Sequence, residues 1–131
     1  MFRAMPSPTA LTIYFFGVTS LIAGLNNLLW PDNALAGLDL PAAARPASNG
    51  MALAAIAMGL YYPLAAWQEN KPFFILTVPM RMLSSTVFWT YSGLWRVASA
   101  WEGVGAILTG AALIWDLQRC RKGAVVNEKS E

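Results

Sequence analysis

Residues 10–29 of this chain read ALTIYFFGVTSLIAGLNNLL and contain no charged side chain. A helix of about 20 apolar residues is long enough to cross the hydrocarbon core of a bilayer. The uncharged interval extends beyond this segment, from Arg3 to Asp32. It is longer than the apolar part of a signal peptide, and no small-residue cleavage site with a soluble domain follows it. We therefore expect a first membrane-spanning helix that stays in the mature protein.

Three further apolar segments follow, and the composition of the whole chain agrees with a lipid environment. The segments are residues 50–67, 72–92 and 97–115. Of the 131 residues, 56% are hydrophobic and 12% are charged, against about 25% charged residues in a typical soluble domain. Helices of a soluble bundle need a polar face, and these segments are apolar nearly all round. The sequence therefore predicts an all-α polytopic membrane protein, an antiparallel bundle of four transmembrane helices within residues 10–118.

The basic residues outside the spans predict the orientation of this bundle. Four spans place both tails, residues 1–9 and 119–131, on the same side of the membrane. That side holds six basic residues and the other side holds two, and basic residues favour the cytoplasmic side. We therefore expect cytoplasmic termini, a multi-pass protein of the endoplasmic reticulum or another endomembrane, and a C-terminal tail that is first basic and then disordered. The connection over residues 30–49 would be a turn-rich cap on the opposite side.

Several classes of chemistry are excluded by missing residue types. The chain has no histidine and a single cysteine, Cys120. Catalysis by Ser-His-Asp or Cys-His, histidine metal ligation and an internal disulfide are therefore ruled out, and we expect no metal and no cofactor. A net charge of +2 is too small to neutralise many phosphates, so no nucleic-acid partner is expected. Cys120 precedes two basic residues, which suits either palmitoylation or a free thiol.

Two charged residues stand out because they lie well inside predicted spans. These are Arg81 and Glu102, out of 16 charged residues in the chain. An arginine near the centre of a membrane helix costs roughly 2.5 to 3.5 kcal/mol, so it needs a partner or a polar cavity. Arg81 lies near the predicted midplane, and Glu102, Asn26 and Asn27 lie in the same half of the membrane. We therefore expect a polar cluster of these four residues.

This cluster has a functional and a structural interpretation. In the functional one, it forms a pocket for an amphipathic lipid or terpenoid-like molecule, where Arg81 binds an oxygen or anionic group and Glu102 acts as proton donor or base. The catalytic candidates are then Glu102 and Arg81. The substrate-binding candidates are Asn26, Asn27, Asn49, Tyr61, Tyr62 and Trp89. In the structural interpretation, Arg81 and Glu102 form an ion pair that fixes helix register, or Arg81 extends to the headgroups.

Other residues have ordinary structural explanations. Trp89, Trp95 and Trp101 flank one predicted boundary of the membrane, where an aromatic belt accounts for them. Pairs of small residues four positions apart occur in three spans, and such pairs let membrane helices approach closely. They suit packing within the chain or a homodimer. The pairs are Ser20 and Gly24, Ala55 and Gly59, and Ala106 and Gly110.

Residues 49–89 read NGMALAAIAMGLYYPLAAWQENKPFFILTVPMRMLSSTVFW and resemble the centre of a family of small four-span membrane proteins found mainly in fungi. The most distinctive parts are the region of Gly59, the turn at residues 68–72 and the run at residues 79–81. Some members of that family are encoded near natural-product biosynthesis genes, and the resemblance implies topology more than activity. In size and span count the chain is also similar to DoxX-like proteins and to the small scaffold protein of ergosterol synthesis.

These features together lead to three hypotheses of function. The first is a membrane protein of lipid-like or secondary-metabolite biosynthesis, of the terpenoid or polyketide kind, that binds a hydrophobic intermediate or assists its isomerisation or cyclisation. The second is a scaffold without catalytic activity that docks membrane biosynthetic enzymes. The third is a small transporter subunit, which would have to oligomerise to form a pore. Membrane lipids are expected partners in each case.

Overall fold

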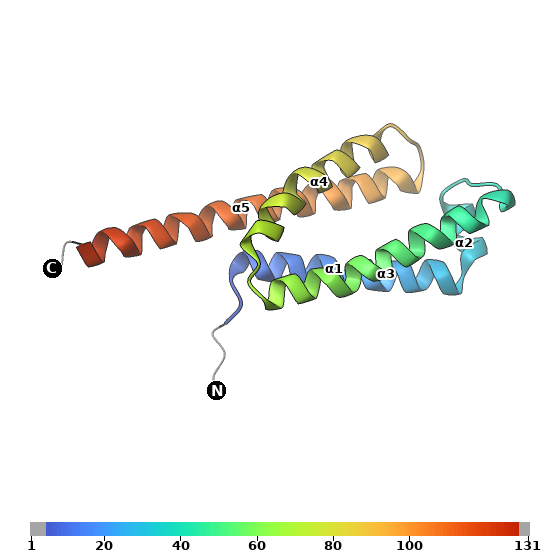
Figure 1. Ribbon diagram of the computed structural model, residues 1–131. Helices are drawn as coiled ribbons and strands as arrows, with labels where there is room; N and C mark the ends of the chain where they lie inside the picture. The colour runs from blue at the N-terminus through green and yellow to red at the C-terminus, as the bar shows by residue number, and fades with distance from the viewer. Residues whose placement is uncertain (1–4, 129–131) are drawn as a thin grey trace.

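The computed structural model describes residues 5–128, and all the regular structure in this range is helical. Five α-helices and one short 3₁₀ turn follow one another (Figure 1). They are α1 (Pro8–Leu29), α2 (Pro31–Gly37), η1 (Ala42–Ala44), α3 (Arg45–Trp67), α4 (Lys71–Trp89) and α5 (Leu94–Glu128). The prediction of an all-α chain is confirmed.

Proline and polar caps fix where the helices begin. A proline occupies the first turn of α1, α2, α3 and α4, where its missing N–H is not needed. The Ser7 hydroxyl accepts the Ala10 N–H at 3.1 Å, and the side-chain Oδ1 of Asn70 accepts the Phe73 N–H at 3.1 Å. These caps satisfy backbone donors that the first turn leaves free. The helices α1 and α4 therefore have defined starts.

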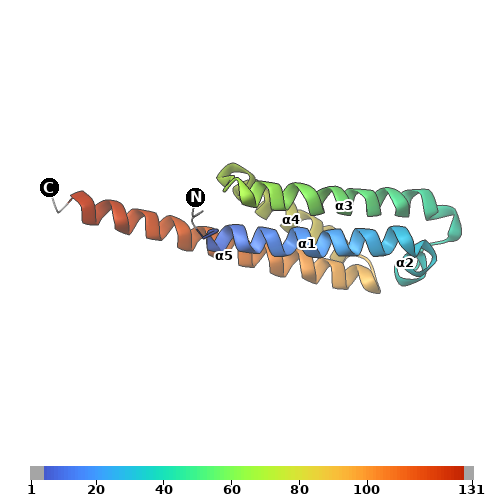
Figure 2. The same cartoon turned by 90° about the horizontal axis from the view of Figure 1, so that it is seen from below.

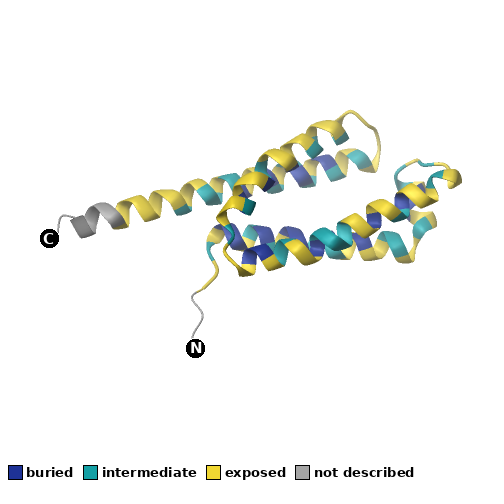
Figure 3. Cartoon of the chain, viewed as in Figure 1, coloured by how far each residue is buried: buried dark blue, intermediate teal, exposed yellow. Residues whose placement is uncertain are grey.

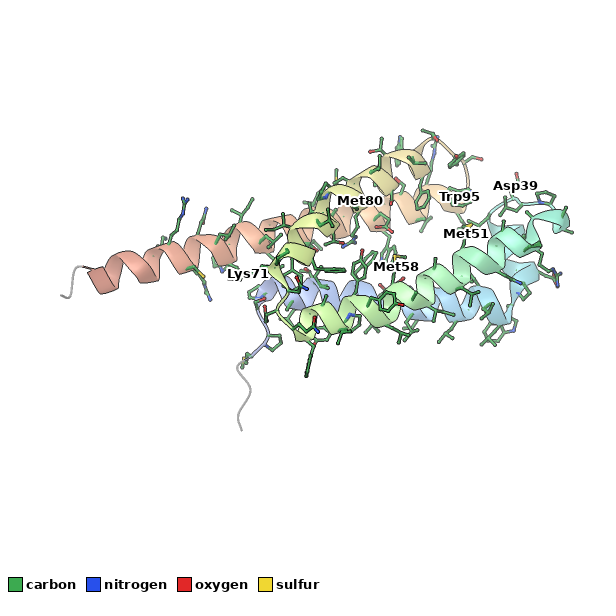
Figure 4. The ribbon with its side chains drawn as sticks, viewed as in Figure 1. Asp39, Met51, Met58, Lys71, Met80 and Trp95 are labelled. Carbon is green, nitrogen blue, oxygen red and sulfur yellow. The ribbon has the colours of Figure 1, made fainter. Side chains whose placement is uncertain are left out.

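The long helices form two hairpins that diverge from a common end. Figure 1 shows α1 and α3 side by side and antiparallel, and α4 and α5 likewise. The hairpins meet mainly where α1 packs against α5, as Figure 2 shows from below. At the wide end the Trp95 indole N–H donates to the Leu38 carbonyl oxygen at 3.2 Å, near Asp39 (Figure 4). α1 is therefore the helix that joins the two halves.

Two carboxylates hold the start of α1 in place. Glu69 accepts hydrogen bonds from the Ser7 N–H and hydroxyl, both at 2.8 Å. Asp116 on α5 accepts from the Thr9 N–H at 3.2 Å and from the Thr9 hydroxyl at 2.6 Å. Carboxylates at a helix N-terminus are favoured by the helix dipole as well as by these bonds. They fix α1 relative to both the α3–α4 turn and α5.

Glycine lets α1 and α3 approach closely. A Cβ at Gly59 would lie 2.5 Å from the Leu21 Cβ, and one at Gly17 would lie 2.5 Å from the Pro63 ring. The Ser20 hydroxyl also donates to the Ala55 carbonyl oxygen across this interface at 2.9 Å. The small residues of α1 and α3 therefore pack against each other within the chain, and Pro63 is a packing residue.

The outer surface of the molecule is apolar. Figure 3 shows buried residues where helices face one another and exposed residues on the outside. Large exposed hydrophobic side chains occur on all four long helices, for example Ile22, Leu60, Leu76 and Ile107. Three stretches are long and apolar enough to cross a membrane: Pro8–Leu29, Ala42–Trp67 and Leu94–Gly123. This surface and these lengths indicate a membrane protein.

The structure differs from the predicted spans in three places. The predicted span over residues 72–92 corresponds to α4, which is not among the three stretches, because Arg81, two prolines and four hydroxyl side chains lower its hydropathy. The connection over residues 30–49 contains α2 and η1 and an ion pair between Arg45 and Asp32. The tail expected to be disordered continues α5 as helix to Glu128, since its Ala, Arg, Lys and Glu residues favour helix. Residues 129–131 of that tail lie outside the described residues.

The close approach of α1 and α3 leads to a prediction about stability. We expect Gly59→Leu to destabilise the protein by about 1 to 3 kcal/mol, because the added side chain forces the two helices apart. Gly50→Leu on the same helix is the matched control, since a Cβ there meets nothing within 4 Å. Thermal unfolding of both variants in detergent measures the difference. Equal midpoints would contradict the packing role of Gly59.

Candidate functional site

Arg81 of α4 and Glu102 of α5 form a buried ion pair. The Arg81 Nε–H donates to Glu102 Oε2 at 3.1 Å, and the two side chains are only 4% and 10% exposed. Two predicted residues are thus brought together between the helices of one hairpin. A charge inside a membrane protein needs such a partner, so the pair lowers the free-energy cost of placing either residue there.

Aromatic rings from α1 and α5 complete the surroundings of the guanidinium. The Arg81 Cζ lies 3.5 Å from the centroid of the Phe16 ring, close enough for a cation–π contact. Phe16 in turn stacks on Trp101, with 4.3 Å between centroids and 19° between planes. Gly105 lies directly against the guanidinium, which would collide with a Cβ at that position. Three helices therefore determine where the head of Arg81 lies.

Two nitrogen atoms of this guanidinium have no hydrogen-bond partner. The Nη1 and Nη2 atoms of Arg81 are buried and make no hydrogen bond within the described residues. An unsatisfied buried donor costs about 1 to 3 kcal/mol, and more when it is charged. Native proteins keep few such groups, and each calls for an explanation. The explanation is the groove that the guanidinium lines.

Arg81 lines an apolar groove between α1 and α5. The groove has a volume of about 630 Å³, within the roughly 300–1,000 Å³ of small-molecule sites. Arg81 is its only charged lining residue in the part of the chain that the structure describes. The other lining residues are Leu11, Thr12, Phe15, Phe16, Val97, Ala100, Trp101, Val104, Gly105 and Leu108. Several of them are also exposed on the outer surface, so the groove opens sideways between the helices.

Hydroxyl side chains tie the helices together around the groove. The Tyr62 hydroxyl bonds to the Thr77 hydroxyl at 2.8 Å, one helical turn before Arg81. Thr12 and Thr109 bond across α1 and α5 at 2.9 Å. The ring of Tyr62 also packs on Phe16, with 4.9 Å between centroids. Tyr62 therefore supports the site through Phe16 and Thr77, but this predicted binding residue does not line the groove.

Asn26 and Asn27 do not join the predicted polar cluster. They follow Phe16 by ten and eleven residues in α1, which places them about 15 Å further along the helix. Asn26 is exposed and Asn27 is half-buried. Two residues in the same predicted half of the membrane can therefore lie too far apart to touch, and the prediction of contact with Arg81 was wrong for both asparagines.

The other predicted binding residues also lie apart from the groove. Asn49 is half-buried near the start of α3, and its side-chain oxygen is buried without a partner. Tyr61 is exposed. Trp89 is exposed as well, with the Arg96 guanidinium 5.4 Å from its ring centroid. None of these three residues, all within the described range, lines the groove.

Sequence reasoning missed Phe16, Trp101 and Gly105. Trp101 was assigned to an interfacial belt, and Phe16 is one of several aromatic residues in an apolar span. One signal was present, because Trp101 and Gly105 are four residues apart and therefore share a helix face next to Glu102. Glu102 itself contacts Arg81 but is not a lining residue of the groove. The structure thus places Arg81, and not Glu102, on the wall of the groove.

The ion pair leads to a prediction about coupling. We expect Arg81→Met and Glu102→Leu each to destabilise the protein by about 3 to 5 kcal/mol, because each leaves a buried charge without its partner. The double variant should regain much of that loss, since an apolar pair can replace a buried ion pair at little net cost. Unfolding of the four proteins in detergent measures the coupling. Strictly additive losses would show that the two residues act independently.

Comparison with known proteins identified no relative of this chain. No family model, no curated protein and no solved structure matches this chain. The described residues also contain no group of three or more His, Cys, Asp or Glu side chains that could hold a metal ion. The resemblance to a fungal four-span family therefore stays a prediction.

Proposed function

We propose that this chain is an integral membrane protein that binds a lipid-like small molecule in the groove between α1 and α5. The apolar part of the molecule would lie along Phe15, Trp101 and Leu108, and its polar end would meet Arg81. One observation carries the proposal: a buried guanidinium with two unpartnered nitrogens lines an otherwise apolar groove of ligand size. Pockets of this composition, apolar with a few polar groups, are typical of ligand sites.

The position of the groove favours a ligand that arrives from the bilayer. Its lining includes Phe15, Val97 and Val104, whose side chains are also exposed on the apolar outer surface. A molecule dissolved in the lipid could enter between α1 and α5 without crossing water. A water-soluble metabolite would have to pass this apolar surface, which disfavours it.

We also propose that α4 crosses the membrane, giving four spans. Its 19 residues form a helix about 28 Å long, close to the hydrocarbon thickness of about 30 Å. Arg81 lowers the hydropathy of α4, but Glu102 compensates its charge. Four spans and the distribution of basic residues support cytoplasmic termini, and an endomembrane location remains part of the proposal.

The biological role that we propose is lipid-like secondary metabolism, with the groove holding a hydrophobic intermediate of terpenoid or polyketide type. Arg81 would contact the intermediate, and Glu102 would act through Arg81 as a positioning residue. Isomerisation or cyclisation with Glu102 as acid or base stays a prediction, because that carboxylate would first have to reach the groove. The scaffold and transporter hypotheses likewise stay predictions.

Blocking the groove tests the binding proposal. We expect Val104→Phe to lower the occupancy of methyl palmitate at least about tenfold, because the larger side chain fills space that the probe needs. Ile107→Phe is the matched control, since Ile107 lies on the same helix, is 63% exposed against 57% for Val104, and does not line the groove. Native mass spectrometry of the detergent-solubilised chain counts bound probe. Equal occupancy in the two variants would contradict the proposal.

Cysteine labelling tests the four-span topology. The chain has one cysteine, Cys120, which is exposed on α5. A membrane-impermeant maleimide should label Cys120 from the same side of sealed vesicles as a tag at the N-terminus. In a Cys120→Ser background, Ser92→Cys in the α4–α5 turn should be labelled from the opposite side. If only α1, α3 and α5 cross, both cysteines will show the reverse sidedness.

A further inference from the structure

We infer that the polar end of the bound molecule is a neutral carbonyl oxygen, as in a ketone or ester, and not a carboxylate or phosphate. The inference rests on the proposed function and specifies its ligand class. Two observations together carry it. The Arg81–Glu102 pair is already neutral, and two guanidinium nitrogens of Arg81 still lack an acceptor.

The first step is the charge balance of the site. Arg81 and Glu102 have opposite formal charges and are both buried, so the pair presents little net charge to the groove. The next cation along α5, Arg96, donates to the Tyr91 carbonyl oxygen at 3.4 Å and lies over the Trp89 ring. An anionic ligand at Arg81 would therefore add an uncompensated negative charge in an apolar environment, which is strongly unfavourable.

The second step is the hydrogen-bonding capacity that remains. Glu102 occupies Nε of Arg81, so only the edge formed by Nη1 and Nη2 is left. A carbonyl oxygen has two lone pairs and can accept from both nitrogens without bringing a charge. A hydrocarbon would fill the groove but leave both donors unsatisfied. The site therefore distinguishes a carbonyl from an anion by charge and from a hydrocarbon by hydrogen bonding.

The third step is the shape of the approach. The Phe16 ring covers a face of the guanidinium at 3.5 Å, so an acceptor reaches the free nitrogens edge-on. Gly105 has no side chain, and Nη2 takes the position that a Cβ there would occupy. An edge-on approach suits a carbonyl, because donors prefer to lie near the plane of the C=O group. It also lets the ester or ketone substituents follow the apolar walls of the groove.

Three probes of equal chain length test this inference: methyl palmitate, hexadecanesulfonate and hexadecane. They represent a neutral carbonyl, a permanent anion and a hydrocarbon. Occupancy of the detergent-solubilised full chain is measured by native mass spectrometry at neutral pH. We expect methyl palmitate to bind about tenfold more tightly than each of the other two, the difference that one or two net hydrogen bonds supply. Arg81→Met should remove its advantage over hexadecane.

A charge variant makes the test specific. In Glu102→Gln the guanidinium loses its compensating charge, so hexadecanesulfonate should gain at least about tenfold relative to methyl palmitate. If that variant does not fold, the three-probe comparison between the unaltered chain and Arg81→Met tests whether the ligand is a neutral carbonyl compound. Tighter binding of hexadecanesulfonate by the unaltered chain would overturn this inference and leave the proposed function standing. If no probe responds to Val104→Phe, the proposed function fails, and this inference fails with it.

Discussion

The placement of one guanidinium constrains the rest of this molecule. Arg81 lies in the middle of an apolar helix and is almost fully buried, where an uncompensated charge would cost more than most single interactions can offset. Glu102 compensates the charge, and the Phe16 ring and Gly105 provide contacts of suitable shape. These residues come from α1, α4 and α5. The requirement to shelter one side chain therefore determines which helices must meet.

Other interactions serve this arrangement by fixing α1. Glu69 and Asp116 hold its first turn against the α3–α4 turn and α5, and Gly17 and Gly59 let it lie directly on α3. In lipid, burial of apolar surface gives little net drive for helix association, so close packing and hydrogen bonds carry more of the stability. Phe16 reaches Arg81 because α1 is held at both of these contacts. The two hairpins can diverge elsewhere without disturbing the site.

The sequence predicted the features that depend on charge and length. Uncharged intervals located the helices, and the rarity of charge within them predicted that Arg81 and Glu102 would need each other. The predicted span over residues 72–92 is not among the stretches apolar enough to cross a membrane, because Arg81, prolines and hydroxyl residues lower the hydropathy of α4, although α4 packs along α5. The polar cluster with Asn26 was wrong because residues in the same half of the membrane can still lie about 15 Å apart along the helix axis. Phe16 and Trp101 could not be recognised, since an aromatic residue in a site and one at a lipid boundary look alike in sequence.

The unpartnered nitrogens of Arg81 bear on why the groove exists. A chain selected only for stability could have satisfied them at little structural cost, for instance with a longer polar side chain at Thr12, which lines the groove. Gly105 has no side chain that could accept from them, because the guanidinium occupies the position of a Cβ there. The Thr12 hydroxyl donates to the Thr9 carbonyl oxygen and bonds to the Thr109 hydroxyl. Local departures from complete hydrogen bonding are expected at functional sites, where they are offset elsewhere in the fold. An acceptor on a molecule in this groove of ligand size would satisfy both nitrogens, as the proposed function expects.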